Sequence, residues 1–479
     1  MEEKQQAPEQ ELRRQYEYME RLREEIRAAE ARKGSPFLYT VVTLGCQMNA
    51  HDSEKLIGIL TEAGAKPAPR EEESDLVVYN TCCVRENAEQ RVFGRLGYLK
   101  SYKSKRPEMK IALCGCMMQE PHVVEKIRRS YPQVDLIFGT FNIYRFAELL
   151  YHLLAGGGPI VDIWKEHREI VEDLPSLRKQ SFKASVNIMY GCNNFCTYCI
   201  VPYVRGRERS RRPEDILAEI RRLTAEGVRE IQLLGKNVNS YGKNLEEPVS
   251  FARLLEMVNE IPGVERIRFM TSHPKDLSPE LMEAMGRLDK VCPHFHLPLQ
   301  SGSSRILQAM NRHYDQEKYL DIVRRLRETV PEMAITTDII VGFPGETRAD
   351  FEETLKVVRE ARFSGAFTFL YSKREGTPAA SMPDQVPEEE AKVNFEELLK
   401  VQEAIQQEDN QKLVGRRLPV LAEEWSKNDP SMLTGRTPGN RLVHFAAGGR
   451  QIGETVTVEI TQASAFYLTG RPADEVDCE

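Results

Sequence analysis

Three strand-like runs in the first third of the chain each lead into a cysteine. These are residues 38–44 before Cys46, residues 76–79 before Cys82, and residues 111–113 before Cys114 and Cys116. Helix-like segments separate the runs, which predicts parallel strands in a doubly wound α/β sheet whose carboxyl ends meet at one edge. Three thiols would then converge at that edge, although buried cysteines are also common as ordinary core residues.

Two of these runs lead into two cysteines each. The sequence favours one cysteine of the later pair and leaves the choice open in the earlier pair. Cys116 follows a glycine, as Cys46 does, and this permits a sharp backbone turn, whereas Cys114 stands at the end of a strand. Cys116 is therefore the favoured ligand. The sequence gives no preference between Cys82 and Cys83.

A second group of thiols has the spacing C-x3-C-x2-C and consists of Cys192, Cys196 and Cys199. Three thiolates on a [4Fe–4S] cluster leave one iron open. That iron can bind the amino and carboxylate groups of S-adenosylmethionine, whose C–S bond an electron from the cluster can break. A structural zinc site would need a fourth ligand close by, but the next cysteine is Cys292. The spacing therefore predicts radical chemistry.

Strand-like and helix-like segments alternate from residue 184 to about 375, which predicts a partial (β/α)6 barrel. The expected strands are residues 185–189, 230–234, 266–270, 296–299, 335–341 and 367–371. Ligands bind such a barrel at the carboxyl ends of its strands. We therefore assign cofactor binding to residues in or near the loops there, namely Gly235, Lys236, Asn237, Gln300, Ser301 and Gly342, and to Tyr198 in the cysteine loop.

The remaining segments complete a five-part organisation. We expect a charged helical extension over residues 1–36, the cysteine-bearing sheet domain over 37–153, a linker over 154–183, the partial barrel over 184–410, and a small C-terminal β-barrel over 411–475. The extension carries a narrow apolar stripe at helical spacing, formed by Leu12, Tyr16, Met19, Leu22 and Ile26.

Basic residues in two places predict contacts with nucleic acid. Arg205 and Arg207 follow the cysteine loop, and Arg416, Arg436 and Arg441 lie in the C-terminal barrel with Phe445, Phe466 and Tyr467. Arginines with interspersed aromatic rings suit phosphate contact and base stacking, although aromatic residues in a small barrel are more often core. The net charge of −7 excludes a general attraction to polyanions.

The first residues are polar and no apolar run follows them, so neither a signal peptide nor a membrane span is expected. We expect a cytoplasmic protein. The ten cysteines are then more readily explained as metal ligands or reduced thiols than as disulfides.

From residue 37 to about 475 the chain resembles the radical S-adenosylmethionine methylthiotransferase family. Residues 45–49, 80–85 and 115–119 are similar to the three ligand motifs of that family's N-terminal domain, which implies that Cys46, Cys82 and Cys116 bind an auxiliary [4Fe–4S] cluster. Cys192, Cys196 and Cys199 match the family's radical-cluster triad. Residues 336–346 match a core motif near the nucleoside, which adds Asp338 to the cofactor-binding residues, and the C-terminal region resembles the RNA-binding TRAM module.

The run from Gly191 to Arg211 resembles the tRNA-modifying branch of the family. This resemblance implies that a methylthio group replaces the C2 hydrogen of an isopentenylated adenosine at tRNA position 37. Two molecules of S-adenosylmethionine would be consumed, one as methyl donor to a sulfur held at the auxiliary cluster and one as the source of a 5′-deoxyadenosyl radical. The implied partners are the anticodon stem-loop and an electron donor such as flavodoxin or ferredoxin. The sulfur donor stays open, and we expect a monomer.

Three other functions compete with this interpretation. They are methylthiolation of threonylcarbamoyladenosine in tRNA, methylthiolation of a ribosomal-protein aspartate, and a non-enzymatic role in RNA binding or cluster transport. One position departs from the family pattern, because Lys236 stands where glutamine is expected.

Overall fold

The structure is a computed structural model that describes residues 2–83, 86–166 and 170–476. The chain divides into two compact units. The first comprises Met1–Lys179, Tyr190–Asn193 and Ile200–Arg209, and the second comprises Gln180–Met189, Asn194–Cys199 and Ser210–Glu479. Cys192 therefore belongs to the first unit, and Cys196 and Cys199 belong to the second.

The first unit is built on a parallel sheet with strand order β2-β1-β3-β4-β5-β6. Its strands are β1 (Leu38–Leu44), β2 (Lys66–Pro67), β3 (Leu76–Thr81), β4 (Lys110–Gly115), β5 (Leu136–Phe138) and β6 (Ile160–Asp162). The strand order reverses direction at β1 and β3, so the doubly wound sheet is confirmed.

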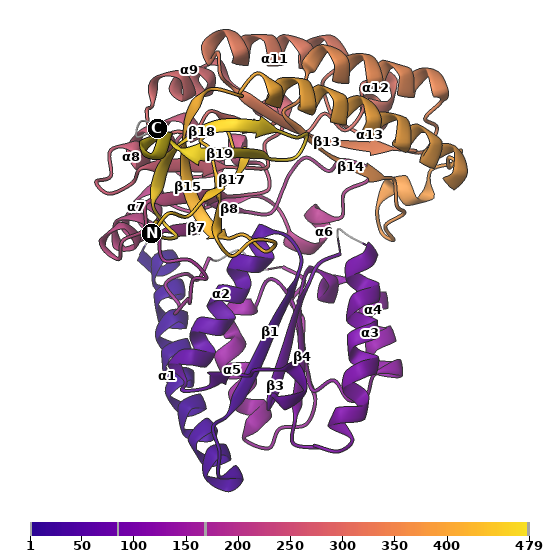
Figure 1. Cartoon of the computed structure of the whole chain (residues 1–479). Helices are drawn as coiled ribbons and strands as arrows, with labels where there is room; N and C mark the ends of the chain where they lie inside the picture. Colours follow the sequence, from indigo (N-terminus) through magenta and orange to yellow (C-terminus); the bar gives the residue numbers. More distant parts are fainter. Residues whose placement is uncertain (1, 84–85, 167–169, 477–479) are drawn as a thin grey trace. The chain divides into compact units, whose positions relative to one another are not determined.

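Helices cover both faces of this sheet (Figure 1). The helices α1 (Glu2–Lys33), α2 (Gln47–Glu62) and α5 (Phe146–Leu154) share one apolar core with β3 and β4. On the opposite face, α3 (Glu86–Lys103) and α4 (Pro121–Ser130) pack on the alternate residues of the same strands. Every residue of β3 is buried, which explains why its first four residues form an apolar run without alternation.

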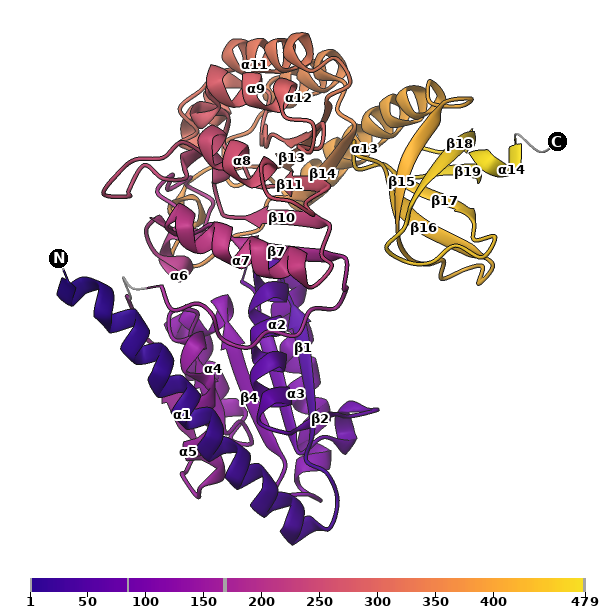
Figure 2. The same ribbon diagram turned by 90° about the vertical axis from the view of Figure 1, so that its left-hand side faces the viewer.

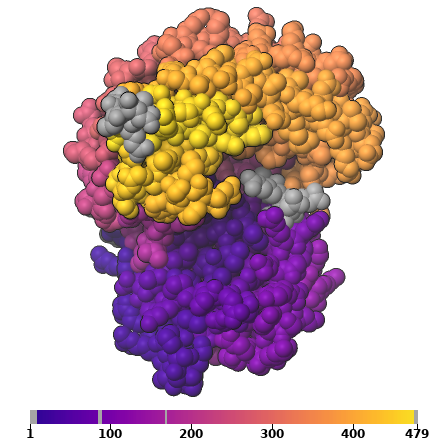
Figure 3. Space-filling view, in the orientation of Figure 1, coloured from indigo at the N-terminus to yellow at the C-terminus, as the bar shows by residue number. Residues whose placement is uncertain are grey.

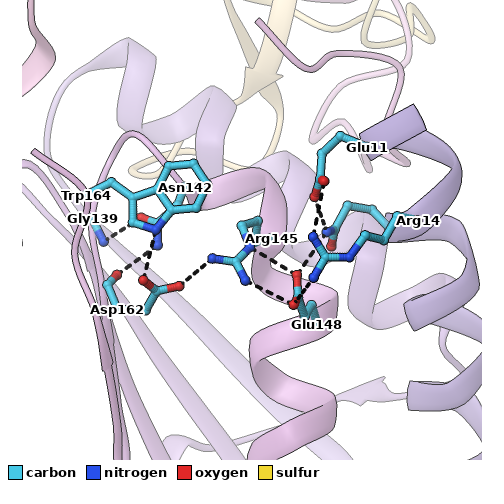
Figure 4. A network of polar contacts seen from close by, with 9 residues as sticks. Glu11, Arg14, Gly139, Asn142, Arg145, Glu148, Asp162 and Trp164 are labelled. Carbon is cyan, nitrogen blue, oxygen red and sulfur yellow. Dashed lines mark hydrogen bonds and ion pairs between the residues drawn. The ribbon is translucent and has the colours of Figure 1, made fainter. Parts of the chain in front are cut away.

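The N-terminal helix α1 packs on the sheet domain through most of the predicted stripe. Met19, Leu22 and Ile26 are buried, but Tyr16 is 44% exposed. Gln15 is fully buried in its place and donates to Glu148 on α5, with Nε2 and Oε2 3.3 Å apart. Glu148 also accepts from Arg145 at 2.9 and 3.0 Å and pairs with Arg14 (Figure 4). A buried polar network therefore fixes the helix beside its apolar contacts.

The second unit contains six parallel strands in two groups of three. One group is β7 (Lys183–Asn187), β10 (Glu230–Leu234) and β11 (Arg266–Phe269), and the other is β12 (His294–His296), β13 (Ala334–Val341) and β14 (Gly365–Leu370). An isolated parallel bridge pairs Ile267 of β11 with Val291, three residues before β12. The helices α7 (Pro213–Ala225), α8 (Phe251–Asn259), α9 (Pro279–Arg287), α10 (Ser304–Ala309), α11 (Gln316–Thr329) and α12 (Arg348–Ala361) connect the strands. The partial (β/α)6 barrel is confirmed.

One expected strand lies earlier in the chain than predicted. Residues 296–299 were expected to form it, but β12 ends at His296. Pro298 follows and has no N–H for the sheet ladder, and the N–H of Leu299 donates to the Thr337 hydroxyl at 2.9 Å. The apolar run is therefore a buried segment beyond the strand.

The helix α13 (Glu388–Gln411) leads into a closed β-barrel (Figure 2). Its strands are β15 (Arg417–Trp425), β16 (Met432–Arg436), β17 (Leu442–Ala446), β18 (Thr455–Ala463) and β19 (Leu468–Pro472), and part of its surface is yellow in Figure 3. Phe445 is a core residue of this barrel, whereas Phe466 and Tyr467 are exposed. No helix within the described ranges is long and apolar enough to cross a lipid bilayer.

We predict that Glu148→Ala lowers the free energy of unfolding of the first unit by about 2–4 kcal/mol, because it leaves buried donors unpaired. Burial by itself would raise the pKa of Glu148, but Arg145 lowers it. The stabilisation is therefore present above the ordinary carboxyl pKa and is lost as the pH falls. Chemical denaturation of the full chain measures this loss. Glu20→Ala removes an exposed partner of Arg23 and should change stability by at most about 0.5 kcal/mol, so equal losses would contradict the prediction.

Candidate functional site

Three cysteines of the first unit follow neighbouring strands at the same edge of its sheet. Leu44 of β1 is the register partner of Thr81 of β3, and Thr81 is the partner of Gly115 of β4. Cys46, Cys82 and Cys116 come two, one and one residues after this row. Because the strands are parallel and adjacent, the cysteines leave the sheet side by side at its carboxyl edge, next to the reversal of strand order where such sheets bind ligands.

A network of buried amides connects the loops that carry these cysteines. Asn49 Oδ1 lies 3.2 Å from Cys46 Sγ, and Asn49 Nδ2 donates to Asn80 Oδ1 at 2.9 Å and to the Thr81 carbonyl at 3.1 Å. Asn80 Nδ2 donates back to the Asn49 carbonyl at 2.8 Å. Our sequence analysis assigned no role to Asn49 or Asn80, although both lie within the cysteine motifs.

The neighbouring thiols differ in their surroundings. Cys114 is fully enclosed in the core shared with α1, α2 and α5. Cys83 hydrogen-bonds Cys116, and this bond together with burial raises the pKa of the Cys83 thiol well above its usual value. Cys83 therefore lies at the sheet edge as Cys82 does. Among the described residues, no three His, Cys, Asp or Glu side chains are gathered as a metal-binding group.

The sequence predicts that Arg205 contacts nucleic acid, whereas in the structure Arg205 is buried. It is the last residue of α6 (Val201–Arg205) and is 4% exposed. Its Nε donates to Cys116 Sγ at 3.1 Å, and its Nη2 pairs with Asp52 Oδ2 at 2.9 Å. Burial would lower the pKa of Arg205, but Cys116, Asp52 and Cys46 raise it well above its usual value. Arg207, two residues later, is exposed.

The loop that carries Cys196 and Cys199 is fixed within the second unit by residues at and just after the end of α10. Thr197 donates to the carbonyls of Met310, through its N–H at 3.1 Å, and Ala309, through its hydroxyl at 2.9 Å. Asn311 Nδ2 donates to the Phe195 carbonyl at 3.0 Å. The N–H of Cys199 donates to the Cys196 carbonyl at 2.9 Å. The two cysteines are thereby held in a tight turn.

Arg312 is a second buried arginine beside a cysteine sulfur. Its Nη1 lies 3.4 Å from Cys196 Sγ and 3.4 Å from the Tyr198 hydroxyl, and its Nη2 donates to the Pro298 carbonyl at 2.9 Å. The sequence analysis missed Arg312, because it is more than one hundred residues from the cysteine that it contacts. Cys192 belongs to the first unit, where its N–H donates to the Gly206 carbonyl at 3.0 Å.

Gly191 can only be glycine, because its φ is +71° and a Cβ would stand 2.0 Å from the Arg207 carbonyl oxygen. The backbone there approaches too closely for any side chain. This requirement fixes the turn that leads into Cys192.

The predicted cofactor-binding loops follow β10, β12 and β13, at the carboxyl ends of the barrel strands. Asn237 donates to Asp276 at 2.8 Å, and its Oδ1, like that of Asn239, is buried without a hydrogen-bond partner among the described residues. Unpaired buried acceptors are costly, so these two atoms fit a polar ligand. Lys236 lies between Gly235 and Asn237 and is partly exposed.

Hydrogen bonds within the protein hold the other candidates in these loops. Gln300 has φ +70° and is connected to β13 through Asp338 and Ile340, with N···O distances of 2.8 and 2.9 Å. Asp338 lies 3.4 Å from His296 Nε2. Ser301 is fully buried, and its hydroxyl accepts a hydrogen bond from the Ser303 N–H within the loop.

Gly342 opens the loop after β13, with φ +80°. Its N–H donates to the Glu346 carboxylate at 2.5 Å. Glu346 is 7% exposed, and burial raises its pKa to about 7.

Arg436 and Arg441 share a cavity of about 150 Å³ with Phe466 and Tyr467, in the second unit. Arg436 contacts Glu423 at 3.4 Å, and Arg441 donates to the Ser364 carbonyl at 3.1 Å. Arg416 does not line this cavity and pairs with Glu332. Two of the predicted arginines and two of the predicted aromatic residues are thus brought together.

Comparison with known proteins separates three segments of the chain. Residues 186–358 match the Radical SAM superfamily, residues 38–139 match a family described as "Uncharacterized protein family UPF0004", and residues 411–473 match the TRAM domain. The fold is similar to that of the radical S-adenosylmethionine methyltransferase TsrM from Kitasatospora setae, with a TM-score of 0.51 and 13% identity over 80% of this chain and 78% of that one.

Relatives named tRNA-2-methylthio-N(6)-dimethylallyladenosine synthase match nearly end to end. That of Acetivibrio thermocellus is 53% identical over 96% of both chains, and that of Lachnoclostridium phytofermentans is 54% identical over 94% of this chain and 99% of its own. The chain belongs to this family. It is a radical S-adenosylmethionine enzyme, so it uses S-adenosylmethionine and a [4Fe–4S] cluster, and the family expected from the motifs is confirmed.

We predict that Glu346→Gln flattens the pH dependence of stability of the second unit. Because the pKa of Glu346 in the folded chain is raised to about 7, the native state binds the proton more tightly than the unfolded state. The stabilisation that comes from protonated Glu346 is therefore fully present below the ordinary glutamate pKa. As the pH rises from there toward 7, the free energy of unfolding falls by about 1.4 kcal/mol per pH unit.

Denaturation of the full chain at a series of pH values from 5 to 8, at about half-unit steps, measures this slope. The control is Glu353→Gln, a partly exposed position on α12. Equal slopes for the Glu346→Gln variant and the unmodified protein would contradict the prediction.

Proposed function

We propose that the protein replaces the C2 hydrogen of N6-isopentenyladenosine at tRNA position 37 with a methylthio group. The observation that carries this proposal is identity above 50% to relatives named for that reaction, over nearly the whole length of both chains. The three matched segments correspond to the cysteine-bearing sheet, the partial barrel of the Radical SAM superfamily and the TRAM domain. An aromatic C2–H bond is not acidic, so a radical is a suitable means of activating it.

The proposed radical cluster is held by Cys192, Cys196 and Cys199. When bound, it supplies the electron that cleaves S-adenosylmethionine to a 5′-deoxyadenosyl radical. Arg312 supports the turn of Cys196, and its positive charge offsets the thiolate charge. The unpaired Oδ1 atoms of Asn237 and Asn239 favour a polar ligand beside the loop after β10. Tyr198, Gly235, Lys236, Gln300, Ser301, Asp338 and Gly342 complete the proposed cofactor-binding set.

The proposed auxiliary [4Fe–4S] cluster is held by Cys46, Cys82 and Cys116. Support comes from their position after three aligned strand ends and from the buried Arg205, which already donates to one of these sulfurs. Three thiol ligands would leave one iron open for the sulfur that is transferred.

The cavity that contains Arg436, Arg441, Phe466 and Tyr467 is the proposed tRNA contact of the C-terminal barrel, since guanidinium groups and exposed rings suit phosphates and unstacked bases. Arg207 and Arg416 are further proposed contacts. We infer a cytoplasmic monomer that receives electrons from a flavodoxin or ferredoxin.

The test is mass spectrometry of nucleosides after anaerobic incubation of the reconstituted protein with reductant, S-adenosylmethionine and isopentenyladenosine-containing tRNA. The 2-methylthio nucleoside is the expected product, and tRNA without the isopentenyl group is the control. Deoxyadenosine without that product would overturn the substrate assignment and favour threonylcarbamoyladenosine or a protein substrate.

We predict that Cys196→Ala abolishes deoxyadenosine formation, whereas Cys46→Ala retains deoxyadenosine formation but gives no methylthio product. The reason is that the two residues belong to different cysteine sets, of which only one cleaves the cofactor. Both products are measured in the same reaction by chromatography and mass spectrometry. Equal loss of cleavage in the two variants would contradict this division.

We also predict that replacing Arg436 and Arg441 with alanine weakens tRNA binding and makes its salt dependence shallower. Each lost phosphate contact should reduce the slope of log K against log salt by about 0.7–0.9. Fluorescence anisotropy at several salt concentrations measures this slope. Arg324→Ala, on the exposed face of α11, removes a positive charge elsewhere in the same unit, and a slope change equal to that of the double variant would contradict the assignment.

A further inference from the structure

The buried ion pair of Arg205 and Asp52 directly contacts a proposed cluster ligand. We propose that these two residues are positioning residues that set the reduction potential of the auxiliary cluster in opposite directions. The inference rests on the proposed function in one respect, since it requires that Cys46, Cys82 and Cys116 hold that cluster.

The geometry connects two of the three cysteine loops through one guanidinium. Arg205 Nε lies 3.1 Å from Cys116 Sγ, and Nη2 lies 2.9 Å from Asp52 Oδ2. Asp52 is on α2, six residues after Cys46, and Cys116 directly follows β4. The planar guanidinium donates in two fixed directions at once. Arg205 thereby fixes Cys116 relative to the helix that begins after Cys46.

Arg205 is itself held firmly within the first unit. The Thr140 hydroxyl donates to the Val204 carbonyl at 2.7 Å. Val204 also packs against Cys83, Cys116 and Ile200 in a small apolar cluster. The segment Ile200–Arg209 thus belongs to the sheet unit, although in sequence it directly follows Cys199 of the radical set.

The direction of the effect follows from charge. Reduction adds one electron to a cluster, so a nearby cation and a hydrogen bond to a ligand sulfur favour the reduced form and raise the potential. The Asp52 carboxylate has the opposite effect. Side chains of both residues are 4% exposed, and such burial reduces screening by solvent. Both effects should therefore be measurable at ordinary ionic strength.

A buried arginine also contacts a cysteine sulfur in the second unit, at one of the three cysteines proposed to hold the radical cluster. Arg312 is also 4% exposed, and its Nη1 lies 3.4 Å from Cys196 Sγ. Here the neighbours of the guanidinium are the Tyr198 and Tyr314 hydroxyls and the Pro298 carbonyl. Among the residues that the structure describes, no carboxylate pairs with Arg312, whereas Arg205 is paired with Asp52. The carboxylate is thus the feature that distinguishes the auxiliary site.

The experiment is a redox titration of the full chain, monitored by electron paramagnetic resonance. Cys196→Ala serves as the background, so that the auxiliary cluster alone is observed. Into it we introduce Arg205→Gln, Asp52→Asn, or both, and iron and sulfide are counted in each protein. The matched control is Arg106→Gln, because Arg106 pairs with the buried Asp75 just before β3, at the amino edge of the same sheet, with a 2.8 Å contact.

Arg205→Gln should shift the potential to more negative values and Asp52→Asn to more positive values. We expect at least a tenfold change in the equilibrium between the oxidation states, which is 59 mV for one electron. The double variant should lie between the two, and Arg106→Gln should leave the potential unchanged. Opposite signs distinguish an electrostatic effect from general damage, which would shift both variants in the same direction or reduce the iron content alone.

Unshifted potentials with full iron content would overturn the inference. If Arg205→Gln does not retain a cluster, Asp52→Asn decides alone, since a positive shift supports the inference and no shift overturns it. A Cys196→Ala protein that binds no cluster would instead overturn the auxiliary cluster of the proposed function, and with it the inference. That result is distinguishable because it appears before any change at Arg205.

Discussion

The alignment of three strand ends is the constraint on which the first unit depends. Leu44, Thr81 and Gly115 form one row across β1, β3 and β4, and a register slip of one residue in any strand would turn its side chains to the opposite face. The row is kept in place by apolar cores on both faces of the sheet. Hydrogen bonds of the Asn49 and Asn80 side chains then fix the loops beyond this row. Three thiols thus leave one edge of the sheet, and hydrogen bonds between their loops hold that edge together.

In the second unit, buried charged side chains hold neighbouring elements in place. Glu230 of β10 is fully enclosed and pairs with Lys183 at 2.9 Å and with Arg268 at 3.0 Å. Arg268 also donates to the carbonyls of Thr437 and Pro438, at 2.8 and 2.9 Å. Burial by itself would raise the pKa of Glu230, but Arg268 and Lys183 lower it. The C-terminal barrel is therefore attached to the partial barrel by hydrogen bonds from an arginine whose own charge is neutralised within the core.

Much of the fold could be predicted because strand and helix signals are local. The strands at residues 38–44 and 230–234 have the predicted bounds. The prediction was wrong where a local pattern was ambiguous. The apolar run beyond His296 contains a proline, and the stripe of α1 includes Gln15 in place of Tyr16 because a buried glutamate 133 residues away provides its partner.

The candidate site was predictable only in part, because some of its contacts join residues that are far apart in the sequence. Cysteine spacing and glycine positions are sequence properties, so the two sets of thiols and their loops could be proposed at once. The roles of Arg205 and Arg312 depend on sulfurs 89 and 116 residues away, and nothing in a run of basic residues distinguishes a buried guanidinium from an exposed one. Arg205 and Arg207 are separated by one glycine and differ completely in exposure.

That difference has a physical consequence for how the first unit folds. A guanidinium cannot be buried in advance of its partners, because an unpaired cation in the core costs several kcal/mol. Arg205 is therefore stable in its place only after α2 and β4 have brought Asp52 and Cys116 to the same edge. The segment that follows the radical cysteines is thus stably buried in the sheet unit only when its cysteine edge is correctly assembled.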